Sequence, residues 1–130
     1  MEKKIVNPWT WQDNFGYAQA VEVKHNQGTL YCSGQTAMTA DGKPAGGNMN
    51  DQILLSLQNL EKVIHQAGYK PAGVVRLNLY TTSIADFFGA YGVLAAWMQQ
   101  HKIVPSSTLL EVKALAFPEL LVEIEATVVG

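Results

Sequence analysis

Residues 53–81, ILLSLQNLEKVIHQAGYKPAGVVRLNLYT, decide the fold, because the spacing of the apolar residues changes within them. The first part carries apolar side chains at helical spacing: Ile53, Leu54, Leu57, Leu60, Val63, Ile64 and Ala67. Asn50 is placed to cap this helix, Gly68 to end it, and Pro71 prevents its continuation. The pattern therefore predicts an amphipathic helix that buries one face.

After Pro71 the apolar period shortens to two, which predicts a β-strand from Gly73 to Thr81. One face of this strand is apolar: Val75, Leu77 and Leu79. The other face is mixed: Val74, Arg76, Asn78 and Tyr80. A helix followed at once by a strand predicts that the two pack against each other.

The flanking sequence supplies four more strands and one more helix. The predicted strands are Tyr17–Lys24, Thr29–Gln35, Ser107–Lys113 and Leu121–Val129, and residues 25–28 are expected to join the first two as a hairpin. A second helix begins after Ser83, whose hydroxyl can cap it with Asp86 three residues later. Gly89 and Gly92 lie inside that helix, where they would permit close approach to the sheet. The order is β-β-α-β-α-β-β, an α+β fold in one domain, residues 1–130, with both helices on one face of one sheet.

The composition is poor in charge. Charged residues make up 15% of the chain, against roughly 25% in an average soluble domain. Arg76 is the only arginine, and hydrophobic residues make up 48%. A sheet whose helices cover one face needs cover on the other, so the scarcity of charge predicts that another subunit packs there.

Several classes of protein are excluded by composition and pattern. The net charge of −2 and the isoelectric point near 5.8 give no basic footprint for nucleic acid. No apolar run approaches the roughly 18 residues of a membrane span, and residues 1–8 lack the apolar stretch of a secretory signal. Cys32 is the single cysteine, so no internal disulfide can form, and the three histidines do not share metal-ligand spacing. We therefore expect a cytoplasmic protein without a metal.

Few residues are candidates for chemistry. Glu123 and Glu125 lie on one face of the last strand, about 6.5 to 7 Å apart, which permits acid–base work but also fits a solvated face. Cys32 has no recognisable base, so we expect it in the core. Arg76 could anchor an anion or form an ion pair on its strand. Three aromatic residues near the start of the chain, Trp9, Trp11 and Phe15, could line a pocket or pack in the core or against a neighbour.

Short segments along the chain resemble the motifs of the YjgF/RidA family, in the family's order and spacing. Gly16–Val21 resembles the family's "GPYSQAV", Ser33–Gln35 its "SGQ", and Gln58–Leu60 with Ala67–Gly68 its "NL…AG" helix. Further segments continue the match toward the end of the chain: Asp86–Phe87, Tyr91, Glu111–Val112 and Val122–Ala126. The resemblance covers the chain from about Phe15 onward.

This resemblance implies a chorismate-mutase-like fold, assembled as a homotrimer with a ligand cleft between adjacent subunits. The best-known members hydrolyse reactive enamines and imines, such as 2-aminoacrylate, to a keto acid and ammonia without a cofactor. Carried over from the family's motifs, Tyr17 and Gly34 are expected to bind substrate, and Glu123 is expected to position and activate water. Glu125 would then be a solvated or interface residue.

The chain departs from the family at one position. Where the family has Pro-Ala-Arg-Ser, this chain has Pro105-Ser106-Ser107-Thr108, so Ser107 occupies the place of a carboxylate-binding arginine. Losing one partner of such a pair costs roughly 2–5 kcal/mol. One interpretation is an enamine or imine deaminase for a substrate without the usual carboxylate, oriented by Ser107 and Thr108. The other is a trimeric small-ligand-binding protein without catalysis. The older description of the family as ribonucleases fits poorly with an acidic chain.

Overall fold

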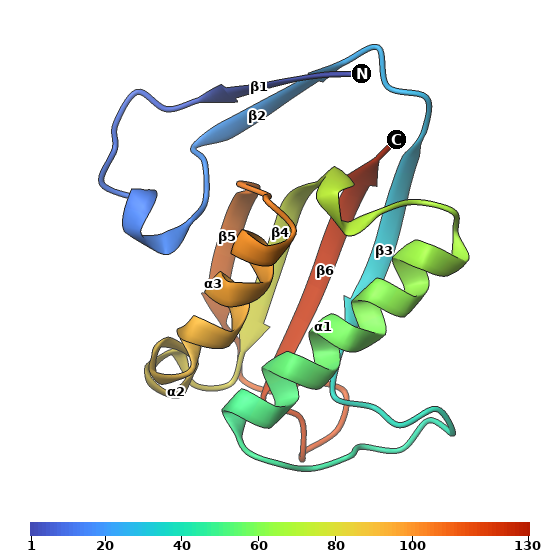
Figure 1. Ribbon diagram of the computed structural model, residues 1–130. Coiled ribbons are helices and arrows are strands. Elements are labelled where there is room, and N and C mark those ends of the chain that lie inside the picture. The colour runs from blue at the N-terminus through green and yellow to red at the C-terminus, as the bar shows by residue number, and fades with distance from the viewer.

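The computed structural model describes residues 1–130, which form an α+β fold with two sheets and three α-helices (Figure 1). In chain order the elements are β1 (Glu2–Val6), the 3₁₀ turn η1 (Asp13–Phe15), β2 (Ala20–Lys24), β3 (Thr29–Gln35), α1 (Met49–Gln66), the 3₁₀ turn η2 (Pro71–Gly73), β4 (Val74–Thr81), α2 (Ile84–Gly89), α3 (Tyr91–Gln100), β5 (Ser106–Glu111) and β6 (Val122–Val129). The predicted order is confirmed, with β1 added at the start and the second helix divided in two.

The predictions of a single sheet and of a hairpin near the start are wrong. The main sheet has four strands in the order β3-β6-β4-β5, and β1 pairs with β2 in a separate antiparallel pair. Strand β2 therefore pairs with β1, through Ile5 and Val21, whereas β3 pairs with β6, through Cys32 and Ala126. Every residue of β1 is exposed, so the sequence has no buried alternation there that would reveal a strand.

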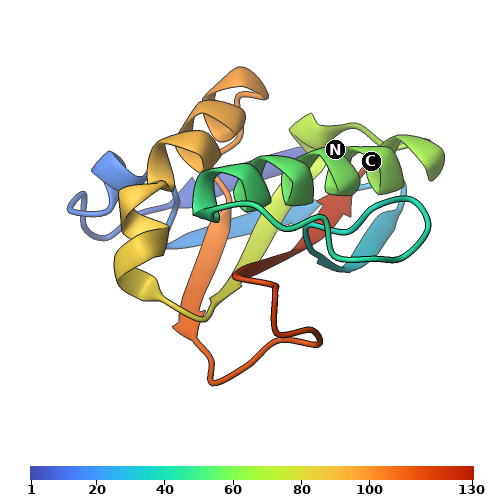
Figure 2. The same ribbon diagram turned by 90° about the horizontal axis from the view of Figure 1, so that it is seen from below.

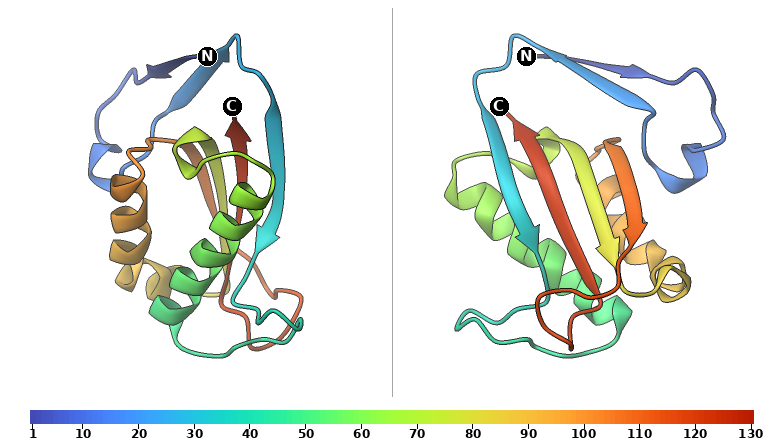
Figure 3. Two further views of the ribbon diagram at one scale, coloured as in Figure 1. Left: turned by 45° about the vertical axis from the view of Figure 1, so that its right-hand side comes forward. Right: turned by 180° about the vertical axis from the view of Figure 1, so that it is seen from behind.

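The helices cover one face of the four-stranded sheet and leave the other open. Figure 2 shows α1 and α3 side by side over the strands, and the rear view of Figure 3 shows the opposite face without any covering element. None of the helices is both long and apolar enough to cross a membrane. The open sheet face is the surface that the sequence predicted to need a partner.

Helix α1 supplies one side of the core. Its buried stripe contains Ile53, Leu57, Leu60 and Ile64, each no more than 1% exposed, and burying a side chain of this kind contributes roughly 1.5–3 kcal/mol. Leu54 is 50% exposed and lies outside the stripe, in contrast to the prediction.

The cap of α1 lies two residues before the predicted Asn50. Asn48 is extended, its side chain accepts a hydrogen bond from the Asp51 amide at 3.0 Å, and the Asp51 carboxylate accepts one from the Asn48 amide at 3.1 Å. This reciprocal pair is a capping box, and it starts the helix two residues earlier than predicted.

Strand β4 carries a β-bulge between Val74 and Arg76. The predicted assignment of residues to the two faces of this strand is therefore wrong at its start. Val74 belongs to the core cluster with Leu77 and Leu79, although strict alternation placed it on the opposite face. A bulge inserts one extra residue and shifts the alternation locally. Beyond it, the predicted alternation holds through Tyr80.

The second predicted helix is interrupted at Ala90. The Ser83 cap is confirmed, because its side chain accepts a hydrogen bond from the Asp86 amide at 3.2 Å. A Cβ atom added at Gly89 or Gly92 would meet no atom within 4 Å, so the expected close approach to the sheet is wrong. Both glycines lie within two residues of Ala90, where their low helix propensity fits a break in the helix.

Replacing Gly92 by Ala should stabilise the protein. The position is helical and open, so alanine adds helix propensity without a clash and raises the unfolding free energy by up to about 1 kcal/mol. Gly68→Ala is the matched control, because that site is equally open but has a φ of +82°, which strains any residue with a side chain. Thermal unfolding should show a higher melting temperature for Gly92→Ala and a lower one for Gly68→Ala. Equal changes in melting temperature for the two variants would contradict the backbone conformations assigned to Gly68 and Gly92.

Glu61 joins the two helical segments that cover the sheet. Its carboxylate accepts a hydrogen bond from Trp97 Nε1 at 2.6 Å and lies 3.0 Å from His101 Nε2. Trp97 and His101 belong to α3 and its end, whereas Glu61 is on α1. This contact fixes α3 beside α1, and α3 in turn bears one wall of the pocket described next. Beneath the helices, Cys32 is buried in the core as predicted.

Candidate functional site

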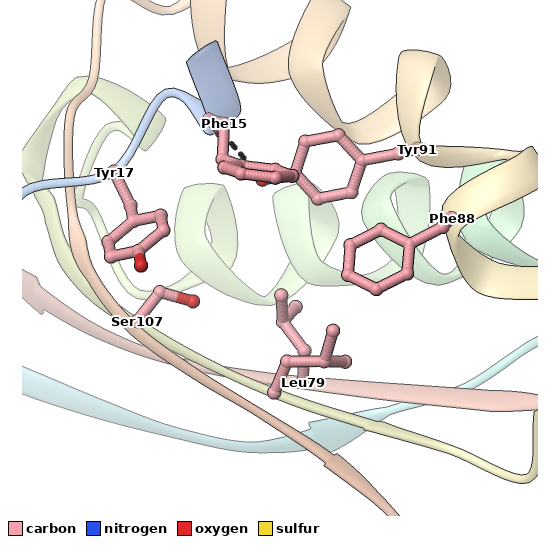
Figure 4. A pocket seen from close by; sticks show the side chains of 7 residues that line it. Phe15, Tyr17, Leu79, Phe88, Tyr91 and Ser107 are labelled. Carbon is pink, nitrogen blue, oxygen red and sulfur yellow. Dashed lines mark hydrogen bonds between the residues drawn. The ribbon is translucent and has the colours of Figure 1, made fainter. Parts of the chain in front are cut away.

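A pocket of about 290 Å³ lies between the edge of the main sheet and the helices α2 and α3 (Figure 4). Its lining is mostly aromatic and aliphatic: Phe15, Tyr17, Leu79, Phe88, Tyr91, Ser107 and Leu109. The structure thus brings Tyr17 and Ser107, two of the residues predicted to bind substrate, to one cavity. Phe88, Leu79 and Leu109 were not identified from the sequence as residues of the pocket wall.

Tyr91 binds the backbone of Phe15, in the segment before β2, and so holds this segment beside the pocket. Its hydroxyl donates a hydrogen bond to the carbonyl of Phe15 at 2.5 Å, and the two rings meet edge to face with centroids 5.9 Å apart. Burial, and then the neighbouring Tyr17 hydroxyl, raise the pKa of Tyr91 to about 12. The phenol therefore stays protonated at neutral pH and acts as a donor, and no residue that lines the pocket is charged.

Glu123 and Gly34 form a second candidate pair, on the open face of the sheet. Glu123 lies on β6 and Gly34 on β3, beside a shift of register between Cys32 and Gln35. A Cβ atom added to Gly34 would lie 2.0 Å from Glu123 Oε2 and 2.7 Å from its Cγ. Only glycine leaves room for the Glu123 side chain in this position, which explains why these two predicted residues occur together.

The two glutamates of β6 differ in their partners. Glu125 accepts hydrogen bonds from Asn78 Nδ2 at 2.8 Å and from the Tyr80 hydroxyl at 2.7 Å. The pKa of Tyr80 is raised mainly because its hydroxyl donates to Glu125. Burial, and then the negative charge of Glu125, raise the pKa of Glu123. Glu125 is thus a structural carboxylate, and Glu123 is the one left available for a ligand.

The raised pKa of Glu123 predicts a pH dependence of stability. The folded protein binds this proton more tightly than the unfolded chain does, so the folded state is favoured at low pH. That advantage is full below the ordinary pKa of 4.5 and is lost as the pH rises toward the raised value. Glu123→Gln should therefore melt at a higher temperature than the wild type at pH 7, and the difference should shrink as the pH falls below 4.5. A difference independent of pH would contradict this assignment.

Thr108 does not join Ser107 in the pocket. Successive residues of β5 point to opposite faces, and Thr108 Oγ1 accepts a hydrogen bond from Arg76 Nη2 at 2.7 Å on the open face. Arg76 Nη1 also donates to Ser106 Oγ at 3.3 Å. The guanidinium is therefore held by two hydroxyl groups, and the ion pair expected for Arg76 is not formed within the chain. A ligand that contacts Thr108 would therefore lie on the opposite face of the sheet from Ser107.

The predicted site residues are consequently divided between two places. Tyr17 and Ser107 line the pocket on the helical side, whereas Gly34 and Glu123 face outward from the uncovered side of the sheet. The pocket lining contains neither Gly34 nor Glu123. A single chain therefore does not bring the four residues into one cavity.

The fold and these features define a class: a small α+β protein with a ligand-sized aromatic pocket beside an uncovered sheet face. Comparison with known proteins identifies the family. Residues 12–130 match the family model described as "Endoribonuclease L-PSP", and the chain belongs to this family, which includes the YjgF and Rid proteins. The resemblance noted in the sequence is thereby confirmed.

Relatives of known structure share the whole fold. The chain is 34% identical to YyfB, a protein of the conserved Rid family from Yersinia pestis, with a TM-score of 0.84 and 99% of each chain covered. The YjgF gene product of Escherichia coli is 26% identical, with a TM-score of 0.69 and 87% of each chain covered. Among curated relatives, mitochondrial mmf1 of Schizosaccharomyces pombe is 29% identical over 84% of this chain. The match spans 65% of mmf1 and 53% of mmf2 from the same yeast.

Proposed function

We propose that this protein is an enamine or imine deaminase that hydrolyses a small substrate lacking the usual carboxylate and releases ammonia. Membership of the Rid/YjgF family supports a small-molecule deaminase or an endoribonuclease-like protein. The observation that carries the proposal is the Glu123 carboxylate, packed over Gly34 and without the hydrogen-bond donors that hold Glu125. The proposal includes no cofactor and no metal.

The proposed chemistry needs one carboxylate and one water molecule. Glu123 takes a proton from water while the water oxygen bonds to the imine carbon, and the C=N electron pair moves to nitrogen. Glu123 returns this proton to nitrogen to give a carbinolamine. The carbinolamine hydroxyl then loses its proton to Glu123 and becomes the carbonyl group as the C–N bond breaks, and this second proton passes to the departing nitrogen, so that ammonia leaves. A carboxylate whose pKa lies above its ordinary value is a stronger base for the first step.

A homotrimer would complete this site. Because Tyr17 and Ser107 lie on one side of the sheet and Glu123 on the other, a cleft between adjacent subunits can combine the pocket of one copy with the carboxylate of the next. The open face is suited to a second copy. It exposes Tyr31 and Leu110, at 79% and 49%, and it carries Arg76 as well as glutamates, so both signs of charge are available for contact with a neighbouring copy in a ring.

The first check is the mass in solution. Light scattering should return three times the chain mass of 14.2 kDa, because the charge-poor open face is expected to be covered by other copies of the chain. The value should persist on dilution to low micromolar concentration. A monomeric mass would rule out the shared cleft.

The activity is tested with a panel of neutral imines, enamines and small carbonyl compounds. The wild type should hydrolyse at least one neutral imine and should act weakly, if at all, on imines of the 2-aminoacrylate type. Ser107→Arg supplies a bidentate carboxylate partner and should raise turnover of keto-acid imines. Failure of the wild type and of this variant on every probe would contradict the proposed deaminase activity.

The alternative function is a trimeric small-ligand-binding protein without catalysis. It is favoured by Ser107, because a hydroxyl group replaces the charged anchor implied by the family motif. In that case ligands bind equally well to the wild type and to Glu123→Gln, and neither turns over any probe.

The ribonuclease description of the matching family is less consistent with the charges of this chain. The net charge is −2, and Arg76, the only arginine, donates to Ser106 and Thr108. Phosphate contacts require cationic groups and give salt-dependent binding. We expect no salt-dependent binding of RNA. A cytoplasmic location likewise stays a prediction, since the yeast relatives mmf1 and mmf2 are named as mitochondrial.

A further inference from the structure

The pocket beside Tyr17 is chemically distinct from a carboxylate-binding site. Six of its seven lining residues are hydrophobic, and the seventh is Ser107. A carboxylate in these surroundings would lose its hydration without gaining a cation, which is strongly unfavourable. The lining therefore selects an uncharged group.

The size and geometry of the pocket fit aromatic rings. Its volume of about 290 Å³ is roughly twice that of a cavity of about 150 Å³ known to take up benzene, so two fused rings can be accommodated. Phe15, Phe88 and Tyr91 pack against one another along one side of the pocket, with ring centroids 5.9 to 6.2 Å apart in edge-to-face and tilted arrangements (Figure 4). Aromatic ligands gain from such edges and faces beyond simple burial.

The hydroxyl groups at the other end of the pocket give a bound ring its orientation. The Tyr91 hydroxyl is already used, because it donates to the carbonyl of Phe15. The Tyr17 and Ser107 side chains lie together on the opposite side of the cavity (Figure 4), and both can donate to or accept from a neutral polar atom of the ligand. The pocket therefore has an aromatic side and a side with two free hydroxyl groups. A ligand with an apolar ring system and one neutral polar edge matches both sides.

Aromatic surface continues outside the pocket. Trp11 meets Tyr17 edge to face at 6.5 Å between centroids, and Trp9 stacks on Trp11 at 6.4 Å. Trp9 is 57% exposed and Trp11 61%, and their stacked rings form one contiguous apolar surface, the kind of surface that marks interaction sites. We call Trp9 and Trp11 together the aromatic platform. Tyr17 contacts Trp11 and lines the pocket, so it connects the platform with the pocket.

We propose that this pocket and its aromatic platform bind an uncharged aromatic ring system of one or two fused rings. One consequence of this inference rests on the proposed function: the substrate is an imine or enamine that bears such a ring. The binding itself is independent of catalysis. Phe15, Phe88 and Tyr91 contact the ring, Tyr17 and Ser107 orient its polar edge, and Trp11 stacks at the entrance.

The test compares indole with its anionic counterpart indole-3-acetate by isothermal titration of the intact protein. Indole should bind the wild type at least about tenfold more tightly, because the carboxylate is desolvated without a partner. Ser107→Arg should reverse the order of the two affinities. Trp11→Ala should weaken indole binding by about two- to tenfold, the value of one aromatic contact. Phe117→Ala removes an exposed aromatic side chain that does not line the pocket and serves as the control.

The outcomes separate this inference from the proposed function. Absence of indole binding, or equal affinity for the two probes, overturns the inference even if the protein hydrolyses an aliphatic neutral imine. Indole binding with the predicted preference supports it even if no probe is turned over, and in that case only the deaminase activity fails.

Discussion

Glu123→Gln should lower turnover of the neutral imine substrate by about 10²–10⁴-fold, the contribution of a positioned general base. Glutamine retains the shape of the side chain over Gly34 but cannot take a proton from water. Steady-state kinetics should show the loss in kcat with little change in KM, because no binding group is removed. The mass in solution should remain that of the wild type.

Glu125→Gln provides the matched control for this change. Glu125 is two residues away on the same face of β6, and its carboxylate is occupied by Asn78 and Tyr80. Its replacement should affect stability more than turnover. If Glu123→Gln retained wild-type kcat while Glu125→Gln lost activity, the two roles would be exchanged and the present assignment would be wrong.

Gly34→Ala is the second substitution with a large expected effect. The added Cβ would lie within 3 Å of three atoms of the Glu123 side chain, so that side chain must turn away. Displacing a catalytic group by about 1 Å can cost about 10²-fold in rate. We therefore expect a loss of turnover close to that of Glu123→Gln.

The fold should tolerate Gly34→Ala, because the clash involves the far end of a flexible, half-buried side chain and the backbone of Gly34 lies outside the left-handed region. Gly89→Ala serves as the control, since nothing lies within 4 Å of its added Cβ. Circular dichroism and thermal melting should find both variants folded. Full activity of Gly34→Ala would contradict the close packing of Gly34 and Glu123 as the basis of the site.

The local patterns in the sequence predicted most of the main sheet and its helices. The stripe Ile53–Ile64 and the Ser83 cap depend on neighbouring residues only, so the sequence carries both signals. Strand β1 was missed because it is exposed throughout and pairs only with β2. The bulge that buries Val74 depends on its pairing with β6, which is not encoded in the alternation of β4 itself.

The candidate site was predicted in part. The resemblance pointed to Tyr17 and Ser107, which the structure places in one pocket, but the pocket walls at Phe88 and Leu109 had no signal beyond their apolar character. Strand alternation did contain the information that Ser107 and Thr108 face opposite sides. Alternation along β6 likewise places Glu123 on the face opposite the core residues Val122 and Ile124. The location of β5, and thus of the pocket, at the edge of the sheet depends on the order of strands, a tertiary property that no local pattern reveals.

The shared cleft between copies is the central claim, and subunit complementation tests it most directly. Glu123→Gln and Ser107→Trp, which fills the pocket, are each expected to be inactive. When the two are co-expressed, a copy with an intact pocket can meet a copy with an intact Glu123, so random mixing should restore about one quarter of the sites. Recovery of turnover toward that fraction is the predicted result. Mixed assemblies, verified by native mass spectrometry, that remain as inactive as the parent variants would contradict it.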